Sequence, residues 1–175
     1  KLAEIGIKQL IKFHTFYLIY KQMGYGKNFY KENTSWIIPL AKRNRLRFLG
    51  YQYCPICFKD ESEEPYLKIN WRFTWNIFCT SHKILLQNNC PSCGEVYQPQ
   101  LLEAASRYIS HCYNCKCNLG LDKSQQVIDN VYKDRALNFQ LRAHNVYLNG
   151  SGSLLGQELK FKDWFGTVLF FLNII

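Results

Sequence analysis

The first and last thirds of the chain carry apolar side chains at helical spacing. Residues 2–23 are densely apolar, in a pattern that fits one or two buried helices better than a strand. Apolar residues return at helical intervals over residues 127–146, and Asn149-Gly150-Ser151-Gly152 predicts the end of that helix. The apolar run from Asp163 onward predicts a last helix that packs on the preceding one or on residues beyond this sequence.

The middle of the chain, from about residue 33 to residue 115, predicts short strands, turns and brief helices instead. Residues 73–77 alternate in strand fashion, and residues 84–86 fit the returning strand of a hairpin. Asn33-Thr34-Ser35 offers an N-cap for a helix that begins at Trp36. Pro65 is a suitable first residue for a further short helix. This part of the chain is therefore expected to be irregular, with its strands close to its turns.

Residues of metal-ligand type fall in four close pairs in this middle stretch, and two residues separate the partners of each pair: Cys54/Cys57, Cys79/His82, Cys90/Cys93 and Cys112/Cys115. Two ligands at this spacing, with Pro or Gly nearby, let a tight turn aim both side chains and its amide N–H groups at one ion. Four pairs supply two tetrahedral sites, one Cys₃His and one Cys₄. We therefore predict two structural zinc ions in a small, zinc-stabilised α+β fold, with tandem zinc-ribbon-like modules flanked by α-helices.

Three regions follow from this pattern. We expect an N-terminal helical segment with a basic run at 1–50, a tandem zinc-ribbon core at 51–120, and a C-terminal helical region at 121–175 that is truncated. Each ribbon is too small to hold a core alone, so a structural zinc should contribute on the order of 10 kcal/mol to folding. Trp71 and Trp75 lie between ligand pairs, which favours core packing over contact with a ligand.

Disulfides and a catalytic zinc are the alternatives that the cysteines raise. Small secreted domains depend on disulfides, but this chain has 175 residues and no visible signal peptide, and disulfides leave the Cys79-x-x-His82 pair unexplained. A catalytic zinc keeps an open position beside three protein ligands, whereas each set here offers four. We therefore expect neither an enzyme nor a small-molecule substrate. Cys117 is the odd thiol, and Cys117 or His111 could take part in the second site.

The charge balance favours a polyanionic partner. The chain has 22 Lys and Arg against 13 Asp and Glu, a formal charge of +9. We predict DNA contacts, in which neutralised phosphates release counterions, from five basic residues near the first ligand pairs: Lys42, Arg43, Arg45, Arg47 and Arg72. The alternative is that these basic residues form a solvent-exposed face that binds no partner. The apolar C-terminal run is shorter than the ~20 residues that a membrane-spanning helix needs, so we expect no membrane partner.

A string of motifs then points to a family. In order, these are Tyr53-Cys54-Pro55-Ile56-Cys57, Pro65-Tyr66, Trp71-Arg72-Phe73-Thr74-Trp75, Cys79-x-x-His82, Leu86 and Cys90-Pro91-x-Cys93-Gly94. Their order and spacing over residues 51–97 resemble the TniQ family, which includes the TnsD-type proteins of target-site selection in transposition. Residues 13–17 are similar to a short His-Thr-aromatic segment near the start of TnsD-type members.

The resemblance implies a role. It makes the protein a cytoplasmic adaptor of a mobile element that links target DNA, or a target-recognition complex, to the transposon's AAA+ ATPase. The family's zinc ligands carry over onto the first two pairs, and also onto the last two. Two other classes stay open: a generic nucleic-acid-binding zinc ribbon, and a RING-like cross-brace domain for protein interaction, in which the first and third pairs would share one ion. Seven residues separate His82 from Cys90, which favours consecutive sites.

Overall fold

The computed structural model describes residues 17–23, 36–38, 50–59, 64–103, 108–120 and 131–173. The chain divides into two compact units. One consists of Asn33–Lys133, and the other of Lys1–Glu32 together with Asp134–Ile175. Helices occur in both units, and a two-stranded sheet occurs in the second, so the predicted small α+β class is confirmed.

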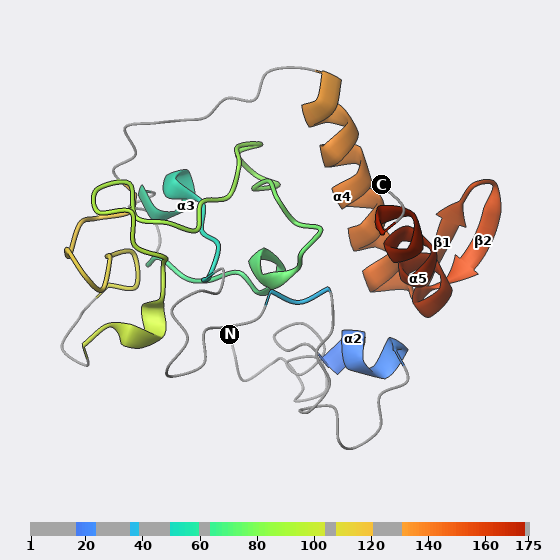
Figure 1. Ribbon diagram of the computed structural model, residues 1–175, viewed down its shortest axis with the longest axis horizontal. Coiled ribbons are helices and arrows are strands. Elements are labelled where there is room, and N and C mark those ends of the chain that lie inside the picture. Colours follow the sequence, from blue (N-terminus) through green and yellow to red (C-terminus); the bar gives the residue numbers. More distant parts are fainter. Residues whose placement is uncertain are drawn as a thin grey trace. The chain divides into compact units, whose positions relative to one another are not determined.

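The Asn33–Lys133 unit is built from turns around short elements. It contains helix α3 (Pro55–Lys59) and two 3₁₀ helices, η3 (Ile69–Arg72) and η4 (Pro99–Leu101) (Figure 1). Strand pairing among its described residues is limited to isolated antiparallel bridges, namely Ile37↔Phe73, Tyr53↔Gln87, Phe78↔Leu85, Asn89↔Val96 and His111↔Asn118. With so little regular backbone bonding, the unit depends on its side chains for cohesion.

Two predictions for this unit were wrong. The helix expected from Trp36 is absent at Trp36–Ile38, where Ile37 forms an antiparallel bridge with Phe73. The helix expected from Pro65 begins at Ile69 instead and is a 3₁₀ turn. Trp36, Ile38 and Trp71 are buried in these two segments, so packing of these side chains outweighs a local capping signal.

One core joins the ligand pairs of this unit. Its buried members are Tyr53, Cys54, Phe58, Trp71, Cys79, Leu86, Cys90, Tyr97, Cys112 and Leu119. The Tyr53 ring stacks on Phe58 at 5.3 Å and meets the edge of Tyr97 at 5.1 Å. Four ligand cysteines therefore belong to the same aromatic core as the residues that hold the unit together.

Two glycines allow the close packing of this core. A Cβ on Gly50 would lie 2.2 Å from the Tyr97 carbonyl oxygen, and one on Gly120 would lie 2.8 Å from the Phe58 backbone. Any larger side chain would push these segments apart. Tyr51 N–H donates to the Tyr97 carbonyl at 3.0 Å, which ties the start of the first ligand region to the second.

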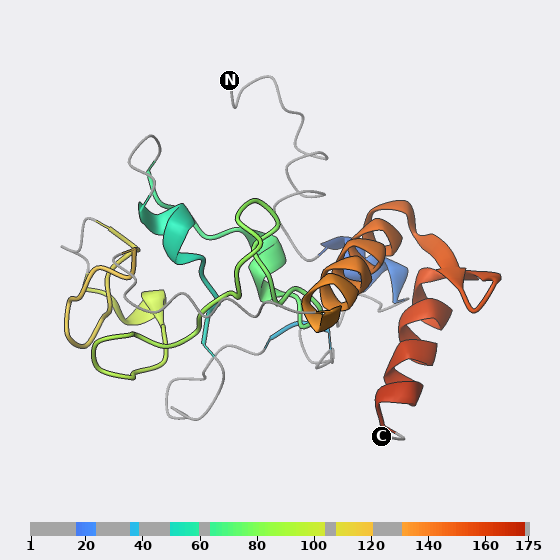
Figure 2. The same cartoon turned by 90° about the horizontal axis from the view of Figure 1, so that it is seen from above.

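The other unit combines three described helices with a hairpin. These are α2 (Tyr17–Gln22), α4 (Val131–Asn149), strands β1 (Ser151–Leu154) and β2 (Gln157–Lys160), and α5 (Phe161–Leu172). The antiparallel register runs from Ser151↔Lys160 to Leu154↔Gln157. The hairpin joins the end of α4 to the start of α5 (Figures 1 and 2).

The two predicted helices of this C-terminal region are confirmed. Helix α4 ends at Asn149, and Gly150 follows at a φ of 81°, the left-handed conformation that terminates helices. Helix α5 packs on α4 through Phe139 and Trp164, whose rings stack at 5.9 Å. The Trp164 indole N–H also donates to the Ser153 carbonyl at 3.3 Å, so the same side chain fixes the hairpin.

The hairpin itself was not predicted. Its two-residue turn uses Leu155 and Gly156 at φ values of 52° and 79°, the signs of a type I′ turn. Leucine is an unusual choice at the first of these positions, so Gly156 alone is a conventional residue for this turn. Of the described helices, none is both long enough and apolar enough to cross a membrane.

Candidate metal centres

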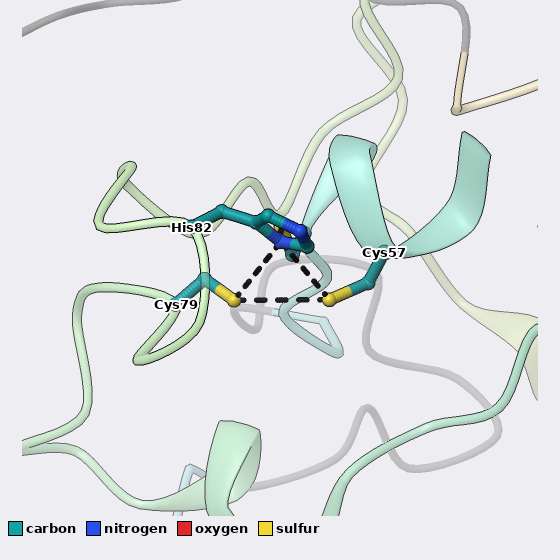
Figure 3. A group of neighbouring side chains, drawn as sticks. Cys57, Cys79 and His82 are labelled. Carbon is teal, nitrogen blue, oxygen red and sulfur yellow. Dashed lines mark hydrogen bonds between the residues drawn. The ribbon is translucent and has the colours of Figure 1, made fainter. Parts of the chain in front are cut away.

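The first candidate centre combines Cys54 and Cys57 with Cys79 and His82, here called the first quartet. The imidazole Nδ1 of His82 lies 3.4 Å from the Sγ atoms of both Cys54 and Cys57, and 3.6 Å from that of Cys79. The Cys57 and Cys79 sulfurs are 3.7 Å apart. Figure 3 shows Cys57, Cys79 and His82 pointing toward one another, from helix α3 and from the facing turn.

The second candidate centre, the second quartet, combines Cys90 and Cys93 with Cys112 and Cys115. The sulfurs of Cys90 and Cys115 lie 3.5 Å apart, and those of Cys93 and Cys112 lie 3.7 Å apart. Cys90 and Cys112 are buried, whereas Cys93 and Cys115 are exposed. The first quartet has no exposed cysteine, so the two centres differ in their access to solvent.

All four ligand pairs share one backbone hydrogen bond. The N–H four residues after the first ligand donates to that ligand's carbonyl in each pair: Phe58 to Cys54, Lys83 to Cys79, Gly94 to Cys90, and Lys116 to Cys112. In the last three turns this donor has a positive φ, between 54° and 76°. Glycine meets that requirement without strain only at Gly94. The shared hydrogen bond explains why two-residue spacing recurs four times in the sequence.

These turns also point amide N–H groups at sulfur. Backbone hydrogen bonds from Ser81 and His82 reach the Cys79 sulfur, and those from Ser92 and Cys93 reach the Cys90 sulfur. Such bonds favour the thiolate over the thiol. The backbone therefore prepares the first cysteine of a pair to carry the charge that metal ligation requires.

The thiols within each quartet differ in pKa. A hydrogen bond with the Cys54 thiol holds the pKa of Cys79 at about 4, and the same contact raises the pKa of Cys54. In the second quartet, burial raises the pKa of Cys90 to about 12, while the backbone N–H of Glu95 lowers that of Cys93 to about 7. A divalent cation would replace these shared protons, because it binds cysteine as the thiolate.

The distances fit a tetrahedral metal ion and exclude disulfides. Zn–S bonds of about 2.3 Å and Zn–N bonds of about 2.0–2.1 Å place tetrahedral sulfurs about 3.8 Å apart and nitrogen–sulfur pairs about 3.6 Å apart. The observed sulfur–sulfur distances of 3.5–3.7 Å and nitrogen–sulfur distances of 3.4–3.6 Å are close to these values. A disulfide needs about 2.05 Å, and all eight cysteines are free. Both clusters can therefore hold a metal ion.

The grouping follows chain order. The first two pairs form one quartet and the last two form the other, so the cross-brace arrangement of the RING-like alternative, with the first and third pairs together, is wrong. Cys117 and His111 belong to neither quartet. The Cys117 Sγ contacts the Asn118 carbonyl at 3.5 Å and packs on the core, while His111 stacks on Tyr108.

The predicted nucleic-acid residues divide in two. The basic run, Lys42, Arg43, Arg45 and Arg47, lies outside the described residues. Arg72 is described: its Nη2 donates to the Ile38 carbonyl at 2.6 Å, and its guanidinium lies 5.0 Å from the centre of the Tyr51 ring. Arg72 thus joins segments of its own unit. The core role predicted for Trp71 and Trp75 is confirmed, because both are buried.

Sequence reasoning missed Lys68, whose Nζ lies 3.6 Å from the Cys57 Sγ. It also left open which nitrogen of His82 faces the cysteines. Neither feature has a signature in residue spacing. Each depends on how the 64–72 segment and the 79–83 turn approach helix α3.

Two consecutive Cys/His clusters on one aromatic core could each hold a metal ion. The model of the TniQ family matches residues 1–86, a stretch that contains the whole first quartet. The match confirms, over these residues, the TniQ resemblance that the motifs predicted. The match implies involvement in target selection during transposition. The second quartet lies beyond the matched residues. No curated protein and no solved structure matches the chain.

Proposed function

We propose that the two quartets hold structural zinc ions. Thiolate and imidazole donors in tetrahedral sets of four are the ligands that structural zinc sites use. Each quartet supplies a full set from the protein, so neither ion would keep a position for water or substrate. A non-catalytic role follows from this closed ligation. Zinc would bind the thiolates that the backbone N–H groups already favour, and would join turns that have few backbone bonds to hold them.

We propose further that the protein is an adaptor in target-site selection, which links target DNA or a target-recognition complex to the transposon's AAA+ ATPase. The observation that carries this proposal is the TniQ family match, which includes all four ligands of the first quartet. The ATPase partner comes from the family resemblance. The DNA partner is supported by the formal charge of +9. A zinc–thiolate protein of this kind suits the reducing cytoplasm.

The test is a pull-down with the full-length, zinc-loaded protein as bait. It is offered the AAA+ ATPase of the same mobile element and, separately, duplex DNA over a range of salt. We expect retention of the ATPase, and DNA retention that falls steeply as salt rises. A variant with Lys42, Arg43, Arg45 and Arg47 changed to Gln should lose DNA and keep the ATPase. Retention of neither partner would overturn the adaptor proposal.

A generic nucleic-acid-binding zinc ribbon is the second candidate, favoured by the same positive charge. It predicts salt-dependent DNA or RNA retention with no affinity for the ATPase. The pull-down therefore separates the two candidates by its ATPase arm. Neither candidate depends on catalysis.

A further inference from the structure

Lys68, in the segment that precedes η3, brings a cation close to the first quartet. Lys68 is half-buried, and its Nζ lies 3.6 Å from the Cys57 Sγ. The same ammonium lies 5.5 Å from the centre of the Trp71 ring and 5.9 Å from that of Tyr66. Two aromatic rings therefore hold a positive charge against one ligand sulfur.

The ammonium and the sulfur act on each other. Partial burial lowers the pKa of Lys68, but the charges of Cys57, Tyr66 and Cys79 together outweigh burial and raise that pKa overall. Lys68 in turn favours the thiolate of Cys57, although burial and the neighbouring Cys79 raise the pKa of this thiol. The attraction between the Lys68 ammonium and the Cys57 sulfur is consistent with the 3.6 Å that separates them.

A metal-filled first centre would carry a net negative charge, which the Lys68 ammonium can neutralise. Three thiolates, one neutral imidazole and Zn²⁺ leave a net charge of −1 on the first centre. An ammonium at hydrogen-bond distance from one of the sulfurs brings the local sum to zero. Outer-sphere partners of this kind orient metal ligands and raise the affinity of the site.

We propose that Lys68 is an outer-sphere residue of the first metal centre, where its ammonium donates to the Cys57 thiolate, neutralises the excess charge and strengthens zinc binding at that centre alone. This inference rests on the proposed zinc sites. It assigns a positioning role to Lys68, which does not itself ligate the metal.

Lys116 provides a matched control. It follows Cys115 of the second quartet directly, but its Nζ donates to the Glu103 carboxylate at 2.8 Å, and both side chains are largely exposed. Its removal deletes the same charge beside the other centre without touching a ligand sulfur. Surface ion pairs of this kind contribute little to the stability of a protein.

The experiment compares the full chain with its Lys68→Met, Lys68→Arg and Lys116→Met variants. Cobalt(II) is titrated against a competing chelator, because Cys₃His and Cys₄ sites give cobalt distinct visible absorption bands. The affinities of the two centres are then read separately in one sample. In parallel, iodoacetamide labelling of the zinc-loaded protein is followed by peptide mass spectrometry to measure how fast Cys57 reacts.

We expect Lys68→Met to weaken cobalt binding at the Cys₃His centre about 10- to 100-fold and to leave the Cys₄ centre unchanged. Cys57 should react faster in this variant, since its sulfur loses a hydrogen bond that a purely structural lysine would not supply. Lys68→Arg should restore both properties, and Lys116→Met should change neither. If Lys68→Met also loses the Cys₄ bands, Lys68→Gln removes the charge with a smaller change in polarity and gives the same comparison.

Unchanged Cys₃His affinity and unchanged Cys57 labelling in Lys68→Met would overturn the role of Lys68 while the zinc proposal stands. An arginine variant as weak as the methionine variant would also overturn it, because the charge would then be irrelevant. A wild-type chain that takes up no cobalt at either quartet would instead overturn the zinc proposal, and the inference with it.

Discussion

Replacement of Tyr97 by alanine should weaken both metal centres, although Tyr97 ligates neither. Its side chain is 1% exposed, and its ring packs edge-on against Tyr53 at 5.1 Å and Phe58 at 6.0 Å. Its hydroxyl donates to the Ile109 carbonyl, which belongs to the segment that leads into the second quartet. Tyr97 thus lies where the surroundings of the two quartets meet.

The expected loss can be worked from this burial. Truncating a buried aromatic ring to alanine costs about 3–5 kcal/mol. Zinc binding and folding are coupled in a unit of this kind, so the lost folding free energy lowers the affinity for zinc. The expected decrease is about 10²- to 10⁴-fold at most. The core contains cysteines of both quartets, so the loss should fall on both ions together. Tyr97→Phe removes only the hydrogen bond and should cost about 1 kcal/mol.

Native mass spectrometry across a chelator titration measures this directly, since it counts the zinc ions that each molecule retains. We expect Tyr97→Ala to lose both ions at lower chelator concentrations than the wild type, and Tyr97→Phe to lie between them. Tyr108→Ala is the matched control, because Tyr108 is 42% exposed in the same unit. A Tyr97→Ala protein that loses one ion early and retains the other as the wild type does would refute the shared core.

Further predictions concern packing, turn geometry and thiol access. Gly50→Ala should destabilise the protein by about 1–3 kcal/mol in urea unfolding, because its Cβ would meet the Tyr97 carbonyl oxygen at 2.2 Å. Gly166→Ala in α5 has open space at its Cβ and should instead stabilise it, by up to about 1 kcal/mol. Leu155→Asn should raise the thermal midpoint, since asparagine tolerates the left-handed turn position better than leucine; an unchanged or lower midpoint would contradict the type I′ assignment. Iodoacetamide should label the exposed Cys93 before any first-quartet cysteine in mass-spectrometric mapping, and the reverse order would contradict the burial difference.

The ligand sets could be predicted because their geometry is local. A turn that places two donors three residues apart leaves its spacing in the sequence, as Cys90 and Cys93 show, and the shared N–H to carbonyl bond explains why. The end of α4 was predictable for the same reason, since Gly150 provides the left-handed residue that terminates the helix. In each case neighbouring residues alone decide the conformation.

Features that depend on distant contacts were not predictable. The bridge between Ile37 and Phe73 forms against a capping signal that favours a helix. The approach of Lys68 to Cys57 depends on the path of the intervening loop, and the β1–β2 hairpin turns at Leu155, a residue with no turn preference. These positions required the packed structure, because the sequence nearby points elsewhere or gives no signal.

The central claim is that two metal ions are held by consecutive quartets, one with three sulfurs and a nitrogen and one with four sulfurs. X-ray absorption at the zinc edge of the purified full-length protein tests it most directly. We predict two zinc ions per chain and an average first shell of seven sulfurs to one nitrogen, at about 2.3 Å and 2.0–2.1 Å respectively. A protein without zinc, or a shell containing water oxygen in place of these donors, would contradict it.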